Sequence, residues 1–487
     1  MLGLSLLTIA YTLYLGYAIF VAMFLILENR SPQSTFAWLF LLLLVPVVGV
    51  VIYWFFGQGR HAFSKERELM RQVVGNEAHS RFARFLERQE AIVAELERSE
   101  QSAPKRKLLH LIQGNGNGLL TTRNQLEILQ NASAKYPCLL RDIEEAKHSI
   151  HMAYYIWDED EFTINLKAKL IEKAQQGVEV RILVDDFGMN VSRRYTKEMH
   201  DNGVQMFVYY NYRSPLRLHT ISYRNHRKIA VIDGRIGYVG GINIGIDHLT
   251  GGKYFHFWRD THLRIEGEAA RVLQATFITS WYNTTKVALT AEEYFPPLHI
   301  DLRSRLPIHI VTSGPDSRWD AIRQLYFLMI LSAEKHIYIQ SPFFIPDDSI
   351  AEALKAAALS GIDVRLMCTP RGGVYQLPYS AANTYFTDMV EAGVRVFLYQ
   401  KGYFHPKTIS IDGQVCSVGT ANMDIRSFSI NYEINAVVYD AKVAQQLEAD
   451  FLKDIDECKE FTLNEYEERP FLRRLNDSFC RLMSPLL

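Results

Sequence analysis

The sequence predicts an α/β protein in which two tandem α/β repeats form one pseudo-twofold domain, preceded by two N-terminal transmembrane helices. Three observations predict this fold class. A pattern of histidine, lysine and aspartate occurs twice with one spacing. Several segments around the first copy recur around the second copy in the same order. The first 57 residues contain two long apolar runs, which are typical of membrane spans.

The chain begins with two apolar runs of membrane-spanning length. Leu4 to Leu27 would form a helix of about 36 Å, and Phe36 to Phe56 one of about 31 Å, against a hydrocarbon core of about 30 Å. Pro46 and Gly49 lie inside the second run, where a membrane helix tolerates them. We therefore expect residues 1–57 to form a membrane hairpin.

The flanking charges predict how such a hairpin is oriented. The loop between the runs carries one basic residue, Arg30, whereas four basic residues follow the second run: Arg60, Lys65, Arg67 and Arg71. The positive-inside rule then places the large C-terminal part in the cytoplasm. A cleaved signal peptide would need a basic start and a small-residue cleavage site, which the first run lacks. A pair of re-entrant or interfacial helices remains the alternative.

Residues 58–118 are predicted to be a juxtamembrane helical linker. The stretch is charged, and its apolar residues recur at helical spacing: Phe82, Phe85, Leu86, Val93 and Leu96. Such a helix packs its apolar stripe on the next domain or lies on the membrane surface, and the sequence leaves both open. The run from Gly114 to Gly118 predicts a break before the globular part.

The two repeats are placed at 119–300 and 301–487. Three pairs of segments match: Ala146–Ile150 with Ala333–Ile337, Gly177–Arg181 with Gly361–Arg365, and Gly203–Val204 with Gly393–Val394. Each unit is predicted to run strand, helix, strand, helix, strand, and then a strand that carries the histidine.

The repeated motif reads H-x-K-x₄-D. Its first copy is His226, Lys228 and Asp233, and its second copy is His405, Lys407 and Asp412. Each copy has a small-residue tail: Gly240-Gly241 and Asn243 in the first, Gly419-Thr420 and Asn422 in the second. Because both copies and both tails share one spacing, we interpret them as half-sites of a single active site, with all six motif residues as candidate catalytic residues.

The motif lies on predicted strands that end in an Asp-Gly pair, the strongest short hairpin signal. Alternation along a strand puts histidine and lysine, two residues apart, on the same face. The aspartates fall on the opposite parity at the turn. They are therefore expected to support the strand more than to touch the substrate.

These residue types suit chemistry at a phosphodiester. A neutral imidazole is a nucleophile towards phosphorus, and a protonated one is an acid for an alkoxide leaving group. The lysines, Asn243 and Asn422 would surround phosphate oxygens, while Gly241 and Thr420 would let the backbone approach. Asp260 and Glu433 lie downstream, where each could orient an imidazole or be an ordinary surface carboxylate. The scheme needs no metal and no cofactor.

Composition disfavours several other classes. A formal net charge of −1 disfavours a protein that binds bulk nucleic acid. Five cysteines without paired spacing indicate scattered reduced thiols. Five further histidines lack metal-ligand spacing and are interpreted as packing or surface residues: His200, His219, His248, His256 and His262. The sequence carries no signal for the oligomeric state.

The twin motif resembles the phospholipase D superfamily, and its surroundings resemble bacterial cardiolipin synthases in particular. The similar segments are Asn225–Ile229, Gly240–Gly245, Trp258–His262, Gly419–Asp424, Arg426–Phe428, the N-terminal hairpin and the Ser484–Leu487 ending. Two positions depart from the family pattern. Pro406 stands where a small residue is commoner, and His248 stands where tyrosine is frequent.

The resemblance implies two phospholipase D-like repeats and a phosphatidyl transfer between two phosphatidylglycerol molecules. Its products would be cardiolipin and glycerol, and its intermediate a phosphatidyl-histidine. By analogy His226 would be the nucleophile and His405 the acid and base, although the residues alone leave these roles open. The partners would be membrane phospholipids, and the location the bacterial inner membrane. The alternative is a hydrolytic phospholipase D, or a phosphatidyltransferase using another alcohol or phosphatidylethanolamine.

Overall fold

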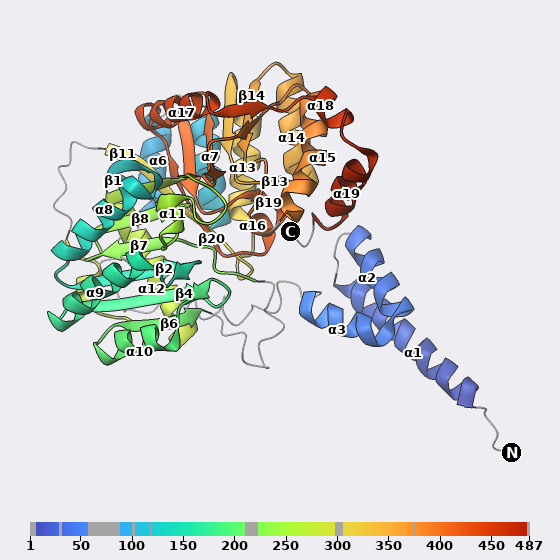
Figure 1. Cartoon of the computed structure of the whole chain (residues 1–487), viewed down its shortest axis with the longest axis horizontal. Coiled ribbons are helices and arrows are strands. Elements are labelled where there is room, and N and C mark those ends of the chain that lie inside the picture. Colours follow the sequence, from blue (N-terminus) through green and yellow to red (C-terminus); the bar gives the residue numbers. More distant parts are fainter. Residues whose placement is uncertain are drawn as a thin grey trace. The chain divides into compact units, whose positions relative to one another are not determined.

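The computed structural model describes residues 6–28, 32–56, 88–99, 103–116, 118–209, 223–297, 305–373 and 376–484 (Figure 1). The chain divides into two compact units. One contains the N-terminal helices, and the other comprises residues 65–210 and 223–487. Each unit is described by itself.

Three helices make up the described part of the N-terminal unit: α1 (Leu6–Leu27), α2 (Pro32–Leu44) and α3 (Pro46–Phe56). Val21 and Leu25 of α1 bury against Leu42 of α2. The Tyr17 hydroxyl also donates a hydrogen bond of 3.2 Å to the carbonyl of Leu42. The two apolar runs therefore form a packed helical hairpin.

The second apolar run is split into two helices, which differs from the single helix expected. Pro46 has no N–H to donate to the preceding turn, so α2 ends at Leu44 and α3 starts at Pro46. Gly49 permits a close approach at this break, since a Cβ there would lie 2.7 Å from the Leu41 carbonyl oxygen. Among the described residues no helix combines the length and apolarity needed to cross a membrane. The two predicted spans are thus not confirmed.

The described part of the linker contains two helices where one was expected, α6 (Gln89–Ser99) and α7 (Ala103–Asn115). Val93 of α6 packs with Leu108 and Ile112 of α7 in the same hydrophobic core as the second half of the sheet. The apolar stripe of this stretch therefore packs on the globular unit. The other predicted stripe residues, Phe82, Phe85 and Leu86, lie outside the described residues.

The globular unit alternates strands and helices in two successive halves. The first contains β1 (Gly118–Gln130), α8 (Asn131–Glu145), β2 (Ser149–Tyr154), β3 (Trp157–Asp158), α9 (Glu161–Gln175), β4 (Glu179–Asp185), β5 (Met189–Asn190), α10 (Arg193–Asp201), β6 (Gln205–Tyr209), β7 (Ile229–Ile232), β8 (Ile236–Gly240), α11 (Asp247–Thr250), β9 (Trp258–Arg259), β10 (Thr261–Gly267), α12 (Glu268–Thr285) and a 3₁₀ turn at Glu292–Tyr294.

The second half repeats this order. It contains β11 (Arg305–Ser313), α13 (Ala321–Ser332), β12 (His336–Gln340), β13 (Phe344–Ile345), α14 (Asp348–Leu359), β14 (Asp363–Cys368), α15 (Leu377–Glu391), β15 (Arg395–Tyr399), β16 (Tyr403–Phe404), β17 (Thr408–Ile411), β18 (Val415–Gly419), β19 (Met423–Asp424), α16 (Ile425–Ser429), β20 (Glu433–Val438), α17 (Ala441–Ile455), β21 (Cys458–Glu460), α18 (Leu463–Glu467) and α19 (Phe471–Leu482).

One 15-stranded sheet runs through both halves, in the order β21-β15-β14-β12-β17-β18-β20-β11-β1-β10-β8-β7-β2-β4-β6. The antiparallel pair β1 and β11 lies at its centre. Outward from this pair, each half adds its strands in the corresponding order, and β21 is an extra edge strand. The sheet therefore has the pseudo-twofold arrangement that the duplicated sequence predicts.

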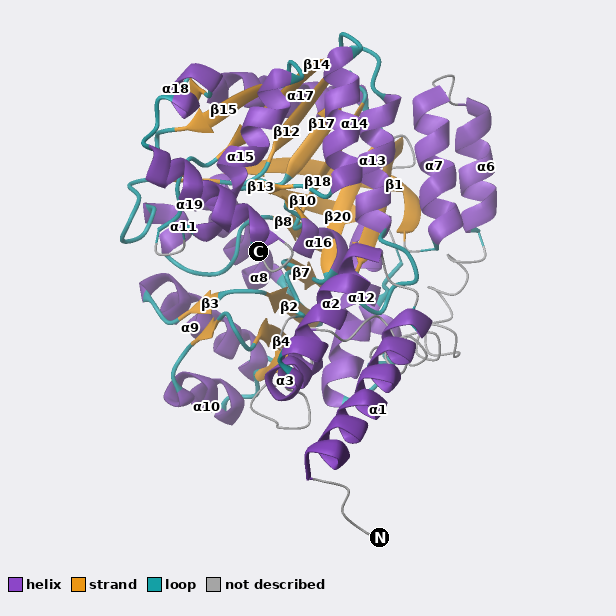
Figure 2. Ribbon diagram, turned by 90° about the vertical axis from the view of Figure 1, so that its right-hand side faces the viewer, coloured by secondary structure: helices purple, strands orange, loops and turns teal. Residues whose placement is uncertain are grey.

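Helices cover the sheet on both faces (Figure 2). In the first half α12 packs on β1, β8 and β10, while α8 and α9 pack over β1 and β4. In the second half α13 and α14 enclose the largest core together with α7, and α17 covers β17 and β18. The α/β layering predicted from the sequence is thus present in both halves.

Candidate active site

The two histidines come together because each is held by the backbone of the opposite half. The His226 N–H donates to the Tyr432 carbonyl at 3.0 Å, and the His405 N–H donates to the Arg259 carbonyl at 2.8 Å. Short parallel pairings reinforce both crossings, one between β16 and β9 and one between Asn225 and Tyr432. The two motif copies, 179 residues apart in sequence, therefore meet at the boundary of the halves.

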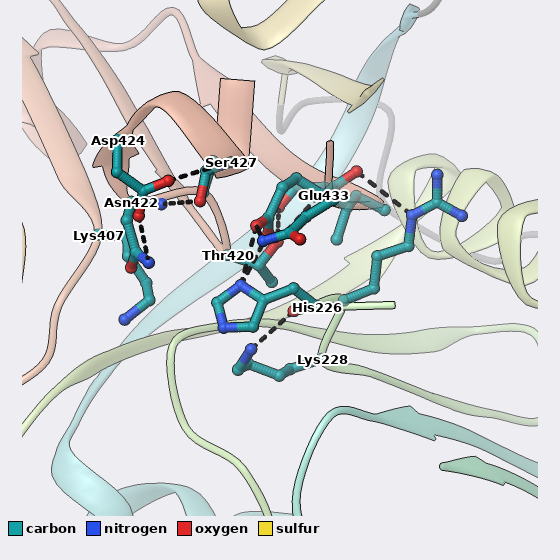
Figure 3. Close-up of polar contacts among 12 residues, drawn as sticks. His226, Lys228, Lys407, Thr420, Asn422, Asp424, Ser427 and Glu433 are labelled. Atoms are coloured by element: carbon teal, nitrogen blue, oxygen red, sulfur yellow. Dashed lines mark hydrogen bonds and ion pairs between the residues drawn. The ribbon is translucent and has the colours of Figure 1, made fainter. Parts of the chain in front are cut away.

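Each imidazole is oriented by an acid from the other half. His226 Nδ1 lies 2.9 Å from Glu433 Oε1, and His405 Nδ1 lies 2.7 Å from Asp260 Oδ2 (Figure 3 shows the first pair). Both carboxylates are completely buried. Since a carboxylate can only accept, each Nδ1 donates, and each Nε2 is left for the pocket. The sequence identified these two acids, but it did not show that the pairing crosses between halves.

The two lysines repeat one geometry. Lys228 Nζ donates to its own histidine's carbonyl, that of His226, at 2.6 Å, and Lys407 Nζ donates to that of His405 at 2.7 Å. Burial lowers the pKa of Lys228 to about 7 and that of Lys407 to about 8, and Glu433 opposes both shifts. Burial therefore disfavours the charged form of both lysines, and an anion bound beside them would favour it.

Burial sets the charge state of the histidines. It lowers the pKa of His226 to about 4; Glu433 opposes this shift, and Lys228 adds to it. Burial and the two lysines also hold the pKa of His405 well below its usual value. Burial raises the pKa of Glu433, but His226 and Lys228 outweigh it, so the net shift is downward. Both imidazoles are therefore neutral at pH 7 in the ligand-free site.

The small-residue tails serve the two acids differently. Gly241 lies against Asp260, where a Cβ would come within 2.0 Å of Oδ1. At the corresponding position Thr420 donates its hydroxyl to Glu433 Oε2 at 2.5 Å. One half-site thus combines a short acid with glycine, whereas the other combines a longer acid with a hydroxyl donor. The two half-sites are not equivalent.

The two asparagines bind neighbouring backbone and side chains. Asn243 Oδ1 accepts from the Ile156 N–H at 3.1 Å, so its amide fixes the loop after β2. Asn422 lines the pocket, and its Nδ2 donates to Asp424 Oδ2 at 3.0 Å. Asp424 in turn caps α16 by accepting from the Ser427 N–H at 2.6 Å. A direct contact of Asn243 with phosphate stays a prediction.

The motif aspartates lie at the far end of their strands from the histidines. Asp233 accepts hydrogen bonds of 2.7–2.9 Å from three consecutive N–H groups at the start of β2, those of residues 147–149. Asp412 binds residues 334–336 at the start of β12 in the same way. Both have positive φ, 51° and 55°, in the turn that the Asp-Gly pair predicts. In the structure the two aspartates thus join strands, and a catalytic role for them stays a prediction.

A pocket of about 400 Å³ opens over the two histidines. Its lining includes five residues to which the sequence assigned no role at the site: Tyr155, Phe187, Arg224, Arg426 and Asn431. The Tyr155 ring meets the His226 ring edge-on, with centroids 5.0 Å apart. Asp185 is buried, and its Oδ2 accepts a hydrogen bond of 2.8 Å from the Asn225 N–H, next to His226 in sequence. These positions lie near the motif in space but outside the H-x-K-x₄-D pattern and its small-residue tails.

The other histidines pack or bind backbone. His248 is buried against Trp258, with ring centroids 4.3 Å apart, and His262 is fully buried. His200 Nε2 lies 2.9 Å from the Met206 carbonyl oxygen, and His256 is exposed. His219 lies outside the described residues. Over the described part of the chain, no group of three potential ligands is arranged to hold a metal ion.

The chain resembles known proteins over nearly its whole length. A family described as "Cardiolipin synthase, PLD-like domain" matches residues 139–253 and 326–455. A family described as "Phospholipase_D-nuclease N-terminal" matches residues 16–58. These matches cover parts of both halves of the sheet and the N-terminal helices.

Two curated relatives illustrate the similarity. A protein of Geobacillus kaustophilus named cardiolipin synthase is 41% identical over 470 residues, covering 96% of this chain and 92% of its own. One of Listeria innocua with the same name is 38% identical over 476 residues, covering 96% of each. Among solved structures, phosphatidylserine synthase of Haemophilus influenzae matches 78% of this chain and all of its own, with a TM-score of 0.60 and 16% identity. That likeness shows a shared fold.

Proposed function

The chain belongs to the bacterial cardiolipin synthase family of phospholipase D-like enzymes, and from this we propose that it transfers a phosphatidyl group between two phosphatidylglycerol molecules, giving cardiolipin and glycerol. The observation that carries the proposal is the pair of imidazoles at one pocket, each oriented by a carboxylate from the opposite half. That arrangement provides a nucleophile and an acid on either side of one phosphorus atom.

The first step forms a covalent intermediate. Glu433 accepts a hydrogen bond from the Nδ1–H of His226, which leaves the Nε2 lone pair free. This lone pair attacks the phosphorus of the donor lipid. A P–N bond forms, the P–O bond to glycerol breaks, and His405 gives its Nε2 proton to the departing oxygen. Lys228 and Lys407 offset the charge that develops on the non-bridging oxygens.

In the second step His405 acts as a base instead of an acid. His405, now neutral, takes the proton of the terminal hydroxyl of a second phosphatidylglycerol. A new P–O bond forms and the P–N bond to His226 breaks, which releases cardiolipin. Water in place of the lipid alcohol would give phosphatidic acid, the product of the alternative hydrolytic activity.

Substrate binding supplies the imidazolium that the first step needs. In the free site, burial and the lysines keep His405 neutral. A phosphodiester anion between the histidines adds negative charge beside His405, which raises its pKa and favours the protonated form. The buried site thus becomes an acid only when it holds its substrate.

We further propose that the N-terminal helices hold the enzyme at the membrane where its lipid substrates lie, with the catalytic part on the cytoplasmic side. Support comes from the apolar character of α1, α2 and α3, and from the basic residues that follow them in sequence. Whether the helices cross the bilayer or lie in it can be tested by labelling cysteines introduced at Ser5 and Ser34 from each side of closed vesicles.

The proposed activity is tested with purified full-length protein in vesicles of labelled phosphatidylglycerol. We expect cardiolipin and free glycerol in equal amounts. Phosphatidic acid as the sole product would instead support the hydrolase. His226→Ala and His405→Ala should each reduce transfer by at least about 10³-fold. The two histidines act as one catalytic unit, so removing either one disables both.

A further inference from the structure

The two half-sites differ in charge at matching positions. Arg224 stands two residues before His226, whereas Tyr403 stands two residues before His405. Arg426 stands four residues after Asn422, whereas Asp247 stands four residues after Asn243. Duplication would place these side chains symmetrically about the two histidines. Instead, Arg224 and Arg426 have no arginine at their matching positions, which are Tyr403 and Asp247.

Both arginines line the pocket above the histidines. The Arg224 guanidinium lies over the Phe187 ring, 5.1 Å from its centroid. Tyr155 lies beside both arginines: its ring stacks on Phe187 with centroids 6.4 Å apart, and while burial raises the pKa of its hydroxyl, the charges of Arg224 and Arg426 oppose that shift. The positive charge therefore converges on one wall of the pocket. At the matching position in the other half, the Tyr403 hydroxyl lies 2.8 Å from that of Tyr379.

The proposed reaction needs positive charge in a second place. The donor phosphate lies between the histidines, where Lys228 and Lys407 are already held. The acceptor is a second anionic lipid, whose own phosphate must come within one glycerol unit of the first. Two like charges at that separation in a partly buried pocket repel each other unless a further cation binds the second one. Arginine suits this role, since its planar donors match phosphate oxygens.

We propose that Arg224 and Arg426 form a binding site for the phosphate of the acceptor lipid, so that the His226 wall of the pocket recognises an anionic acceptor. This inference rests on the proposed phosphatidyl transfer and adds which wall receives the second lipid. A pocket of about 400 Å³ is within the range of small-molecule binding sites, about 300–1,000 Å³. The acyl chains of the acceptor would lie along Phe187 and Pro378, the apolar lining at the same mouth.

The test separates formation of the phosphatidyl-enzyme from use of an anionic acceptor. Full-length enzyme in phosphatidylglycerol vesicles is given labelled free glycerol, an uncharged acceptor, and two products are followed. Exchange of label into phosphatidylglycerol reports the donor step, and cardiolipin reports transfer to the anionic lipid. Variants Arg224→Gln and Arg426→Gln are compared with Arg194→Gln, which removes a positive charge from the exposed face of α10.

We expect each pocket variant to lower the ratio of cardiolipin formation to glycerol exchange by about 10- to 100-fold, as loss of a charge-assisted hydrogen bond would. Arg224→Lys and Arg426→Lys should recover part of that ratio because the charge returns. Arg194→Gln should leave both products unchanged.

Two results would overturn the acceptor site. Equal loss of exchange and synthesis, in glutamine and lysine variants alike, would place the arginines at the donor phosphate or in folding. An unchanged ratio would remove them from lipid recognition. Failure of the underlying transfer is recognised separately, because the wild-type enzyme would then give neither labelled phosphatidylglycerol nor cardiolipin.

Discussion

At the scale of single residues, the site depends on hydrogen bonds that cross from one repeat to the other. His226 and Glu433 are 207 positions apart, and His405 and Asp260 are 145 apart. The acids therefore hold the tautomer of an imidazole that their own repeat does not provide. Thr420 and Gly241 then make the two pairs unequal, which gives a physical reason for the histidines to have different roles.

Replacing either acid should impair catalysis without removing the imidazoles. We expect Glu433→Gln and Asp260→Asn to lower kcat by about 10²- to 10⁴-fold, because an amide can stabilise the wrong tautomer of its histidine. Steady-state transfer assays measure this, and the pH profile should shift because a negative charge beside each imidazole is lost. Glu266→Gln, on β10 but paired with Arg235, is the matched control and should retain activity. Unchanged kinetics in the Glu433 and Asp260 variants would contradict the orienting role.

The pH dependence of kcat/KM follows from the same groups. Protonation of His226 below about pH 4 removes the nucleophile. Above about pH 7 to 8, Lys228 and Lys407 lose their charge and no longer attract the phosphate. We therefore expect kcat/KM to be highest between about pH 4 and 7 and to fall towards alkaline pH. Initial rates on mixed micelles measure this profile, and a value that rises steadily from pH 6 to 9 would contradict it.

At the level of helices and strands, each copy of the motif carries residues of the proposed reaction at one end of a strand and a residue that binds the neighbouring strand at the other end. The histidine and lysine precede or begin the strand, and the aspartate closes it at the hairpin turn, where it binds three backbone N–H groups of the neighbouring strand. The seven-residue spacing between histidine and aspartate is thus set by the length of the strand. The motif combines a catalytic end and a structural end.

Asp233→Ala and Asp412→Ala should therefore act on stability. Each removes the acceptor of three hydrogen bonds, which we expect to lower the free energy of unfolding by about 1–3 kcal/mol. Thermal unfolding followed by circular dichroism measures the loss, and the remaining folded protein should keep its kcat within about threefold. Asp→Asn at the same positions keeps one oxygen acceptor and tolerates the positive φ, so it should be milder. Loss of kcat at unchanged stability would return these residues to the chemistry.

Much of the element order could be predicted because it depends on local patterns. The Asp-Gly turns and the alternation of strands and helices follow from local residue patterns, whereas His226 and Lys228 lie just before β7 and not on the strand expected. The break between Leu44 and Pro46 could have been predicted from Pro46, which interrupts helical hydrogen bonding. It was not predicted, because membrane helices tolerate proline. A role for Arg224 and Arg426 could not be predicted in this way, because the fold, not a local pattern, brings the two side chains to one pocket.

At the scale of the whole globular unit, duplication has produced one continuous sheet with one composite site at its centre. The pairing of β1 with β11 fixes the two halves, and the short pairings β16 with β9 and Asn225 with Tyr432 align the histidine segments. Neither half provides both the imidazole and the carboxylate of an active-site pair. The sequence predicted two half-sites of one site; the exchange of acids between them depends on contacts that no local pattern records.

We infer that His226 receives the phosphatidyl group while His405, held by Asp260, transfers the proton. It is tested most directly by incubating the full-length enzyme with phosphatidylglycerol labelled in its acyl chains, stopping the reaction in alkaline denaturant, which preserves a P–N bond, and locating the label by peptide mass spectrometry. We predict label on the peptide that contains His226, and none in His226→Ala. Label on the His405 peptide, or transfer without any labelled histidine, would contradict the account.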